Sequence, residues 1–110
     1  MEESKKIAVI GGGSWATALV KILCNNVSSL NWYMRNEEAV AHILKFRHNP
    51  NYLQSVEFDI NKINVSTDLE AMIRPADIVI IATPSAFLVK LFEDFPTELL
   101  ADKMVFSAVK

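Results

Sequence analysis

The sequence predicts an α/β fold, an open and doubly wound parallel sheet covered by helices in a three-layer αβα arrangement. Short apolar, β-branched runs alternate with segments of helical spacing, which calls for right-handed crossovers between parallel strands. The run at 78–82 is continuously apolar, as a strand covered on both faces must be. All three glycines stand together at 11–13, between a strand and a helix. This alternation predicts the strand order 3-2-1-4-5.

Each expected element follows from its local pattern. In chain order they are a strand at 6–10, a helix at 14–24, a strand at 30–34, a helix from 37 to about 46, a strand at 63–66, a short helix, a strand at 78–82, a helix interrupted by Pro96, and a strand at 104–108. Asn36 is the expected N-cap of the second helix, and Thr67 with Glu70 forms a capping-box pattern for the short helix that Pro75 closes. The strand at 78–82 is expected at the centre of the sheet.

The composition is that of one ordinary globular domain. The chain has 110 residues, of which 51% are hydrophobic and 22% charged. A net charge of -2 without a basic run argues against a nucleic-acid partner, and no apolar run is long enough to predict a membrane span. The charged start does not fit a signal peptide, and the single Cys24 is expected to pack in the core. A cytoplasmic location is therefore expected.

The glycines carry the main functional signal. Gly11, Gly13 and Ala16 fit the pattern G-x-G-x-x-G/A in the first strand-to-helix turn, the fingerprint of a Rossmann-type dinucleotide site. In this motif the first glycine permits the tight turn, the second lets the backbone approach a pyrophosphate, and Ala16 allows close packing of the helix. The phosphates would meet the N–H groups that open the helix. The sequence therefore predicts a cofactor of the NAD or NADP type.

Further candidates surround this turn. Ser14 either caps the helix or contacts the cofactor, and Trp15 is better explained as lining a site than as core. At the end of the second strand, where an acidic residue usually holds the ribose of NAD, the chain has Arg35. An arginine there could hold the 2′-phosphate of NADP, stack on the adenine or be a solvated charge, while Glu37 or Glu38 could reach the ribose instead.

Lys110, just past the last strand, is a further candidate. It either faces a substrate phosphate or carbonyl or is a solvated charge.

Other chemistries find little support. His42 and His48 have no Cys, His or Asp at metal-ligand spacing, so no metal site is predicted. The sequence has no nucleophile elbow, Walker loop or paired-carboxylate pattern, which leaves hydrolase and kinase functions without a basis.

The order and spacing of several segments resemble the N-terminal domain of the NAD(P)-dependent glycerol-3-phosphate dehydrogenases. The segments that carry this resemblance are Gly11-Gly12-Gly13-Ser14-Trp15-Ala16-Thr17-Ala18-Leu19, Trp32, Arg35, Asn51-Tyr52-Leu53, Asp68-Leu69, Ala76-Asp77-Ile78-Val79, Pro84-Ser85 and Lys110. The chain departs from the family pattern in three places, where Ala16 replaces a glycine, Met34 a polar residue and Gln54 a proline.

The resemblance implies a function and a division into domains. It implies that residues 1–110 are the NAD(P)-binding domain of an oxidoreductase, and that a helical C-terminal domain, absent here, holds the catalytic residue and forms a homodimer. The full enzyme would transfer hydride reversibly between NAD(P)H and dihydroxyacetone phosphate, giving sn-glycerol 3-phosphate for glycerophospholipid synthesis. By resemblance, Ser14, Trp15, Arg35, Phe87 and Lys110 contact the cofactor, and Lys110 also touches the substrate.

Two other functions fit the same residues. One is a stand-alone module that senses a dinucleotide without catalysis, and the other is a related NAD(P)-dependent reductase of another small substrate. No catalytic residue is expected within these 110 residues, so the chain alone is expected to bind cofactor with little or no turnover.

Overall fold

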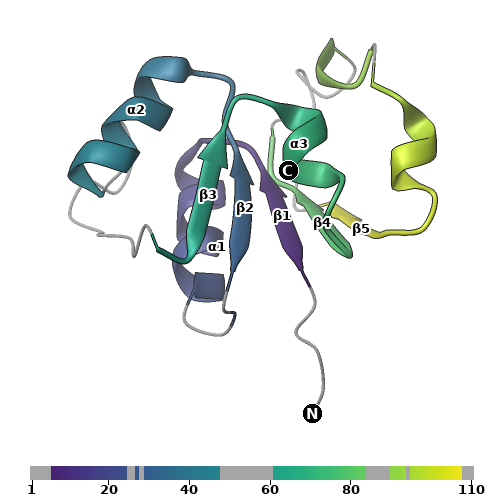
Figure 1. Ribbon diagram of the computed structural model, residues 1–110, viewed down its shortest axis with the longest axis horizontal. Coiled ribbons are helices and arrows are strands. Elements are labelled where there is room, and N and C mark those ends of the chain that lie inside the picture. The colour runs from purple at the N-terminus through teal and green to yellow at the C-terminus, as the bar shows by residue number, and fades with distance from the viewer. Residues whose placement is uncertain are drawn as a thin grey trace.

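The fold is a single parallel sheet with helices packed against it, shown in Figure 1 as a computed structural model. The structure describes residues 6–24, 27, 29–47, 61–83, 90–93 and 95–107, except the side chains of Ser14 and Thr97. The strands are β1 (Ile7–Ile10), β2 (Leu30–Tyr33), β3 (Ile63–Ser66), β4 (Ile78–Ile81) and β5 (Met104–Ser107). The helical elements are α1 (Ser14–Cys24), α2 (Glu37–Phe46), α3 (Leu69–Ile73) and the 3-10 helix η1 (Thr97–Leu100).

The strand order is β3-β2-β1-β4-β5, and all four pairings are parallel. This confirms the predicted topology, since each strand returns to the same direction through a crossover. β1 pairs with β2 on one side and with β4 on the other, so that Ile10 lies beside both Tyr33 and Ile81. The carboxyl ends of β1, β2 and β4 therefore meet at one edge of the sheet. In doubly wound sheets, ligands bind at this edge.

Two hydrophobic clusters cover the two faces of the sheet. One joins the inward sides of α1 and α2 to alternate strand residues such as Val9, Trp32 and Val65. The other joins α3 and the segment at 91–100 to the intervening strand residues, among them Ala8 and Val79. Figure 1 shows α1 behind the sheet and α3 in front of it. The period-two alternation of strand side chains thus produces the predicted three layers.

The helix caps confirm one prediction and correct another. Asn36 caps α2 as expected, its side-chain oxygen accepting hydrogen bonds from the N–H groups of Glu38 at 2.9 Å and Ala39 at 3.1 Å. For α3 the expected box of Thr67 and Glu70 is wrong. Asp68 is the N-cap and accepts from the N–H of Ala71 at 3.1 Å. An aspartate is an equally good acceptor and its charge suits the helix start, so it takes the position one residue later.

The place of β4 also differs from the expectation. β4 is an interior strand, but β1 occupies the centre of the order and is buried along its whole length. In β4 only Val79 is fully buried, and the other three residues are half-buried. A continuous apolar run distinguishes an interior strand from an edge strand, but it does not say which interior position the strand takes.

The helix expected before Pro96 is described only at its end, Lys90 and Leu91.

Candidate functional site

The glycine turn, residues 11–13, lies at the carboxyl end of β1. Gly11 has a φ of 136°, a conformation that L side chains rarely adopt. A Cβ at this position would lie 2.8 Å from the carbonyl oxygen of Ala82. The N–H of Gly11 donates to the carbonyl of Tyr33 at 2.9 Å, which ties the turn to the end of β2. The predicted role of Gly11 in a tight turn is confirmed.

Donors from neighbouring segments of the chain hold the carbonyl groups at the start of the turn. The oxygen of Ile10 accepts from the backbone N–H of Ala82 at 2.8 Å and from the hydroxyl of Thr83 at 3.1 Å. The oxygen of Gly11 accepts from the indole N–H of Trp32 at 2.6 Å, a buried hydrogen bond between positions 21 apart in the sequence. These contacts come from the residues that directly follow β4 and from β2, and both strands are neighbours of β1.

The end of the turn is held by α1 itself. The carbonyl of Gly13 accepts from both the N–H and the hydroxyl of Thr17, at 2.9 and 2.7 Å. Thr17 is fully buried, and the carbonyl of Gly13 is the acceptor for its hydroxyl. Ala16, also fully buried, lets the helix pack closely against the sheet, as the motif predicts.

The outer side of the turn is open. A Cβ added at Gly13 would have no heavy atom within 4 Å among the described parts of the chain outside its immediate neighbours. The first turn of α1 contains no acidic residue, so nothing there opposes an anion at the positive end of this 11-residue helix. The open space at Gly13 is a cradle that a side chain would fill, and it fits the approach of a diphosphate to the backbone.

Ser14 and Trp15 directly follow the glycine turn and begin α1. Trp15 is 48% exposed in the first turn of α1, so it is not a core residue. Its exposure agrees with the prediction that it lines a site, and its contact with a cofactor stays a prediction. Ser14 begins the helix, and its side chain is outside the described part of the structure.

At the end of β2, consecutive side chains have different environments. Tyr33 is buried on the face that packs against α3, and this burial raises the pKa of its phenol above the ordinary value, while the charge of Arg35 lowers it by a smaller amount. Met34 is buried beneath the turn, where its Cε would lie 2.8 Å from a Cβ at Gly12. Arg35 is exposed, as are Glu37 and Glu38 in the first turn of α2. Met34 therefore supports the turn. The exposed charged residues Arg35, Glu37 and Glu38 remain the candidates to contact the ribose of the cofactor.

The remaining predicted residues are only partly described. Phe87, Lys110 and His48 lie outside the described residues. His42 packs its ring against Phe46 with the ring centroids 4.6 Å apart. In the part of the chain that the structure describes, no group of three or more His, Cys, Asp or Glu residues could hold a metal ion. Within the same residues, no helix has the length and apolar character that a membrane crossing requires.

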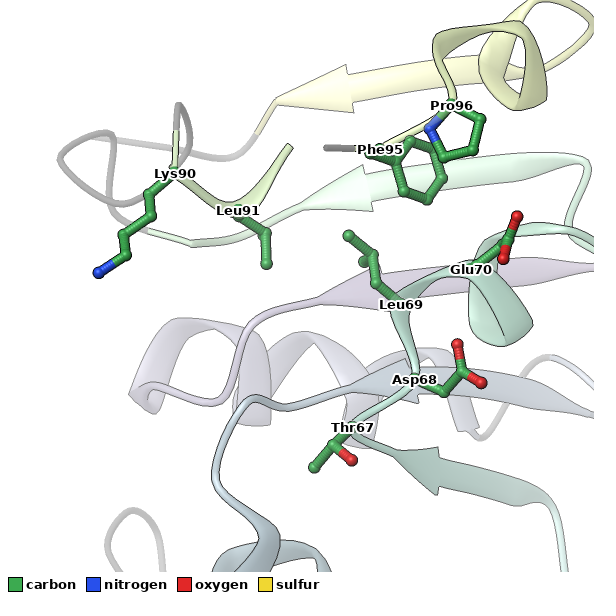
Figure 2. Close-up of a pocket in the computed structure, with 8 residues that line it drawn as sticks. All are labelled: Thr67, Asp68, Leu69, Glu70, Lys90, Leu91, Phe95 and Pro96. Atoms are coloured by element: carbon green, nitrogen blue, oxygen red, sulfur yellow. The ribbon is translucent and has the colours of Figure 1, made fainter. Parts of the chain in front are cut away.

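A hollow lies beyond the end of β3, between the start of α3 and the segment at 90–96 (Figure 2). It is lined by Thr67, Asp68, Leu69, Glu70, Lys90, Leu91, Phe95 and Pro96. Figure 2 shows Leu69 facing Leu91 and Phe95, whereas Lys90 extends away at one end. The two carboxylates are engaged within the chain, Asp68 as the helix cap and Glu70 with Arg74 at 2.8 Å. The hollow is thus a surface feature of the α3 layer rather than part of the glycine turn.

Sequence reasoning missed the donors that hold the turn. It placed Thr83 on the ligand-binding edge of the sheet but gave neither Thr83 nor Thr17 a role as a donor, and it used Trp32 only as a point of resemblance. A hydroxyl on the apolar side of α1 is a signal that could have identified Thr17, because a buried hydroxyl needs a partner, which is often the carbonyl four residues earlier.

The parallel sheet and the glycine turn together define a dinucleotide-binding domain of the Rossmann class.

Comparison with known proteins defines the family. Residues 6–110 match the model of the NAD-dependent glycerol-3-phosphate dehydrogenase N-terminus, and the chain belongs to this family. A glycerol-3-phosphate dehydrogenase [NAD(P)+] of Pseudomonas paraeruginosa is 35% identical over 111 residues, covering 100% of this chain and 32% of that protein. The chain thus spans about a third of the length of the curated relatives it matches.

Solved structures confirm the fold. A glycerol-3-phosphate dehydrogenase from Saccharomyces cerevisiae superposes with a TM-score of 0.87 at 20% identity, over 98% of this chain and 34% of that one. The enzyme from Plasmodium falciparum gives 0.80 at 24% identity, over 94% and 31%. The predicted fold class and family are therefore confirmed.

Proposed function

We propose that this chain binds NAD or NADP at the carboxyl edge of its sheet, as the cofactor domain of a longer oxidoreductase. The observation that carries the proposal is the glycine turn, with its carbonyl groups held by the chain's own donors and with open space at Gly13. This arrangement leaves the start of α1 to face an anion. The NAD-dependence of the family supports the same cofactor.

Different described residues would contact different parts of the cofactor. The turn and the start of α1 receive the diphosphate, with Trp15 beside it, and Arg35 meets the adenosine ribose or its 2′-phosphate. By family resemblance, Ser14, Phe87 and Lys110 complete the site. The bound nicotinamide supplies or accepts the hydride, and this chain positions it by fixing the adenosine and diphosphate.

The reaction proposed for the whole enzyme is hydride transfer between NAD(P)H and dihydroxyacetone phosphate, to give sn-glycerol 3-phosphate for glycerophospholipid synthesis. The names of the relatives support this substrate, and their greater length supports a further domain that binds it. A cytoplasmic location is part of the proposal. The single cysteine, Cys24, supports it, since a buried free thiol is typical of a reducing compartment.

Binding and turnover should be measured separately. We expect the 110-residue chain to bind NADH or NADPH in calorimetry at millimolar ligand, and to oxidise neither with dihydroxyacetone phosphate. The longer protein in which this sequence is embedded should oxidise at least one of them with that substrate. Well-folded chain that releases no heat with either coenzyme would overturn the cofactor assignment. Binding without turnover in the longer protein would leave the sensing module, or a reductase of another small substrate, as the better function.

Arg35 provides the test of cofactor choice. If its guanidinium holds the 2′-phosphate, Arg35→Asp should lower the affinity for NADPH about tenfold more than that for NADH, because a charge-assisted hydrogen bond is lost. The two dissociation constants can be measured from NAD(P)H fluorescence. Arg74→Asp is the matched control, since it makes the same change in net charge at the end of α3, where Arg74 forms an ion pair with Glu70. An unchanged ratio in Arg35→Asp would show that Arg35 does not select the cofactor.

A further inference from the structure

We propose that Trp32 is a positioning residue of the dinucleotide site, and that its indole N–H orients the glycine turn toward the diphosphate. The proposal rests on the function proposed above. It assigns to a core residue of β2, which touches no ligand, a measurable share of cofactor affinity.

The geometry places Trp32 directly beneath the turn. Its side chain has no exposed surface and belongs to the cluster that packs α1 against the sheet. Trp32 pairs with Val9 in the register of β2 on β1, which brings its indole under the end of β1. The indole N–H then donates to the carbonyl of Gly11 at 2.6 Å.

The direction of this hydrogen bond determines the direction of the next N–H. The peptide bond between Gly11 and Gly12 is planar and trans, so its C=O and N–H groups point in opposite directions. By holding the Gly11 oxygen toward the core, Trp32 directs the N–H of Gly12 toward the outer side of the turn. Gly11 needs such a restraint because a glycine has a wide choice of backbone conformations.

Packing alone would not call for this residue. A phenylalanine could fill most of the same apolar space, whereas a buried indole N–H needs an acceptor. The acceptor here is the carbonyl of Gly11. Thr17 and Thr83 hold the carbonyls of Gly13 and Ile10 in the same way, so the indole N–H is one of three side-chain donors that fix the turn.

The test removes the donor and keeps the ring. Two variants are made in the 110-residue chain, Trp32→Phe and a replacement of Trp32 by 3-benzothienylalanine, which has nearly the shape of tryptophan but no N–H. We expect both to raise the dissociation constants of NADH and of ADP about tenfold. The factor should be the same for the two ligands, because they share the diphosphate and differ in the nicotinamide.

A destabilised control separates positioning from stability. Ile43→Val changes a fully buried residue of α2 in the same hydrophobic cluster and should lower the free energy of unfolding without changing either dissociation constant. Wild-type affinity in the benzothienylalanine variant would overturn the proposal, and so would an equal loss of affinity in Ile43→Val. The benzothienylalanine variant keeps the test valid if Trp32→Phe does not fold.

One further measurement needs no ligand. The amide NMR signal of Gly12 should shift in the benzothienylalanine variant, because the orientation of the peptide is no longer held. If wild-type chain bound neither NADH nor ADP, the proposed function would fail, whereas this signal would still decide whether Trp32 orients the turn. An unchanged Gly12 signal would overturn the role of Trp32 even if the chain bound both ligands.

Discussion

Gly11→Ala is expected to lower the free energy of unfolding by about 3 kcal/mol or more. Two causes act together. The φ of 136° is strained for any residue with a Cβ, and the new methyl group would lie 2.8 Å from the backbone oxygen of Ala82. Because that oxygen belongs to the chain leaving β4, relief would require β1 and β4 to separate. Urea unfolding followed by circular dichroism measures the change.

The neighbouring glycine provides the control. A methyl group at Gly12 would also approach a heavy atom to 2.8 Å, but that atom is the Cε at the flexible end of Met34. Gly12→Ala should therefore cost about 1 kcal/mol, because a side chain moves more easily than a strand. Equal losses in the two variants would contradict the argument that backbone strain at Gly11 dominates.

The parts of the fold that sequence reasoning predicted are those with local causes. The strand, glycine turn and α1 follow each other within residues 6–24, and the helix bounds observed, Ser14–Cys24, agree with those predicted. The N-cap at Asn36 depends on contacts two and three residues away. The strand order followed from the alternation of elements, because parallel crossovers allow few topologies.

The parts that it missed depend on register and on competition between neighbours. The contact of Trp32 with Gly11 joins positions 21 apart and exists only because Val9 pairs with Trp32. Thr67 and Asp68 can both cap α3, and the sequence pattern alone does not decide between them. The central place of β1 already follows from the predicted strand order, and the apolar run of β4 is compatible with any interior position.

The three glycines therefore serve different purposes, although the motif presents them as one unit. The conformation of Gly11 is required by the fold itself, and Gly12 accommodates Met34. The φ of Gly13 is outside the left-handed region, and its outer side is open in the described chain. No contact in the described structure explains why Gly13 lacks a side chain, so we expect the explanation to lie with the proposed ligand.

Gly13→Ala should accordingly separate binding from stability. We expect its free energy of unfolding to stay within about 1 kcal/mol of wild type, since a methyl group there meets only open space and the loss is that of a weaker helix cap. The same methyl group would stand where the diphosphate approaches the backbone. Losing a hydrogen bond between a backbone N–H and the charged diphosphate costs about 1.5–3 kcal/mol, so NADH binding should weaken about 100-fold. Urea unfolding and NADH fluorescence titration give the two quantities.

Ala41→Gly is the matched control for Gly13→Ala. Residue 41 is exposed in the middle of α2, away from the turn, and glycine there should cost about 1 kcal/mol of stability. Because this variant has a comparable loss of stability and an intact turn, its NADH affinity should equal that of wild type. If Gly13→Ala bound NADH as tightly as Ala41→Gly, the open side of the turn would not be where the diphosphate lies. The motif would then describe only a tight turn, and Gly11 alone would account for it.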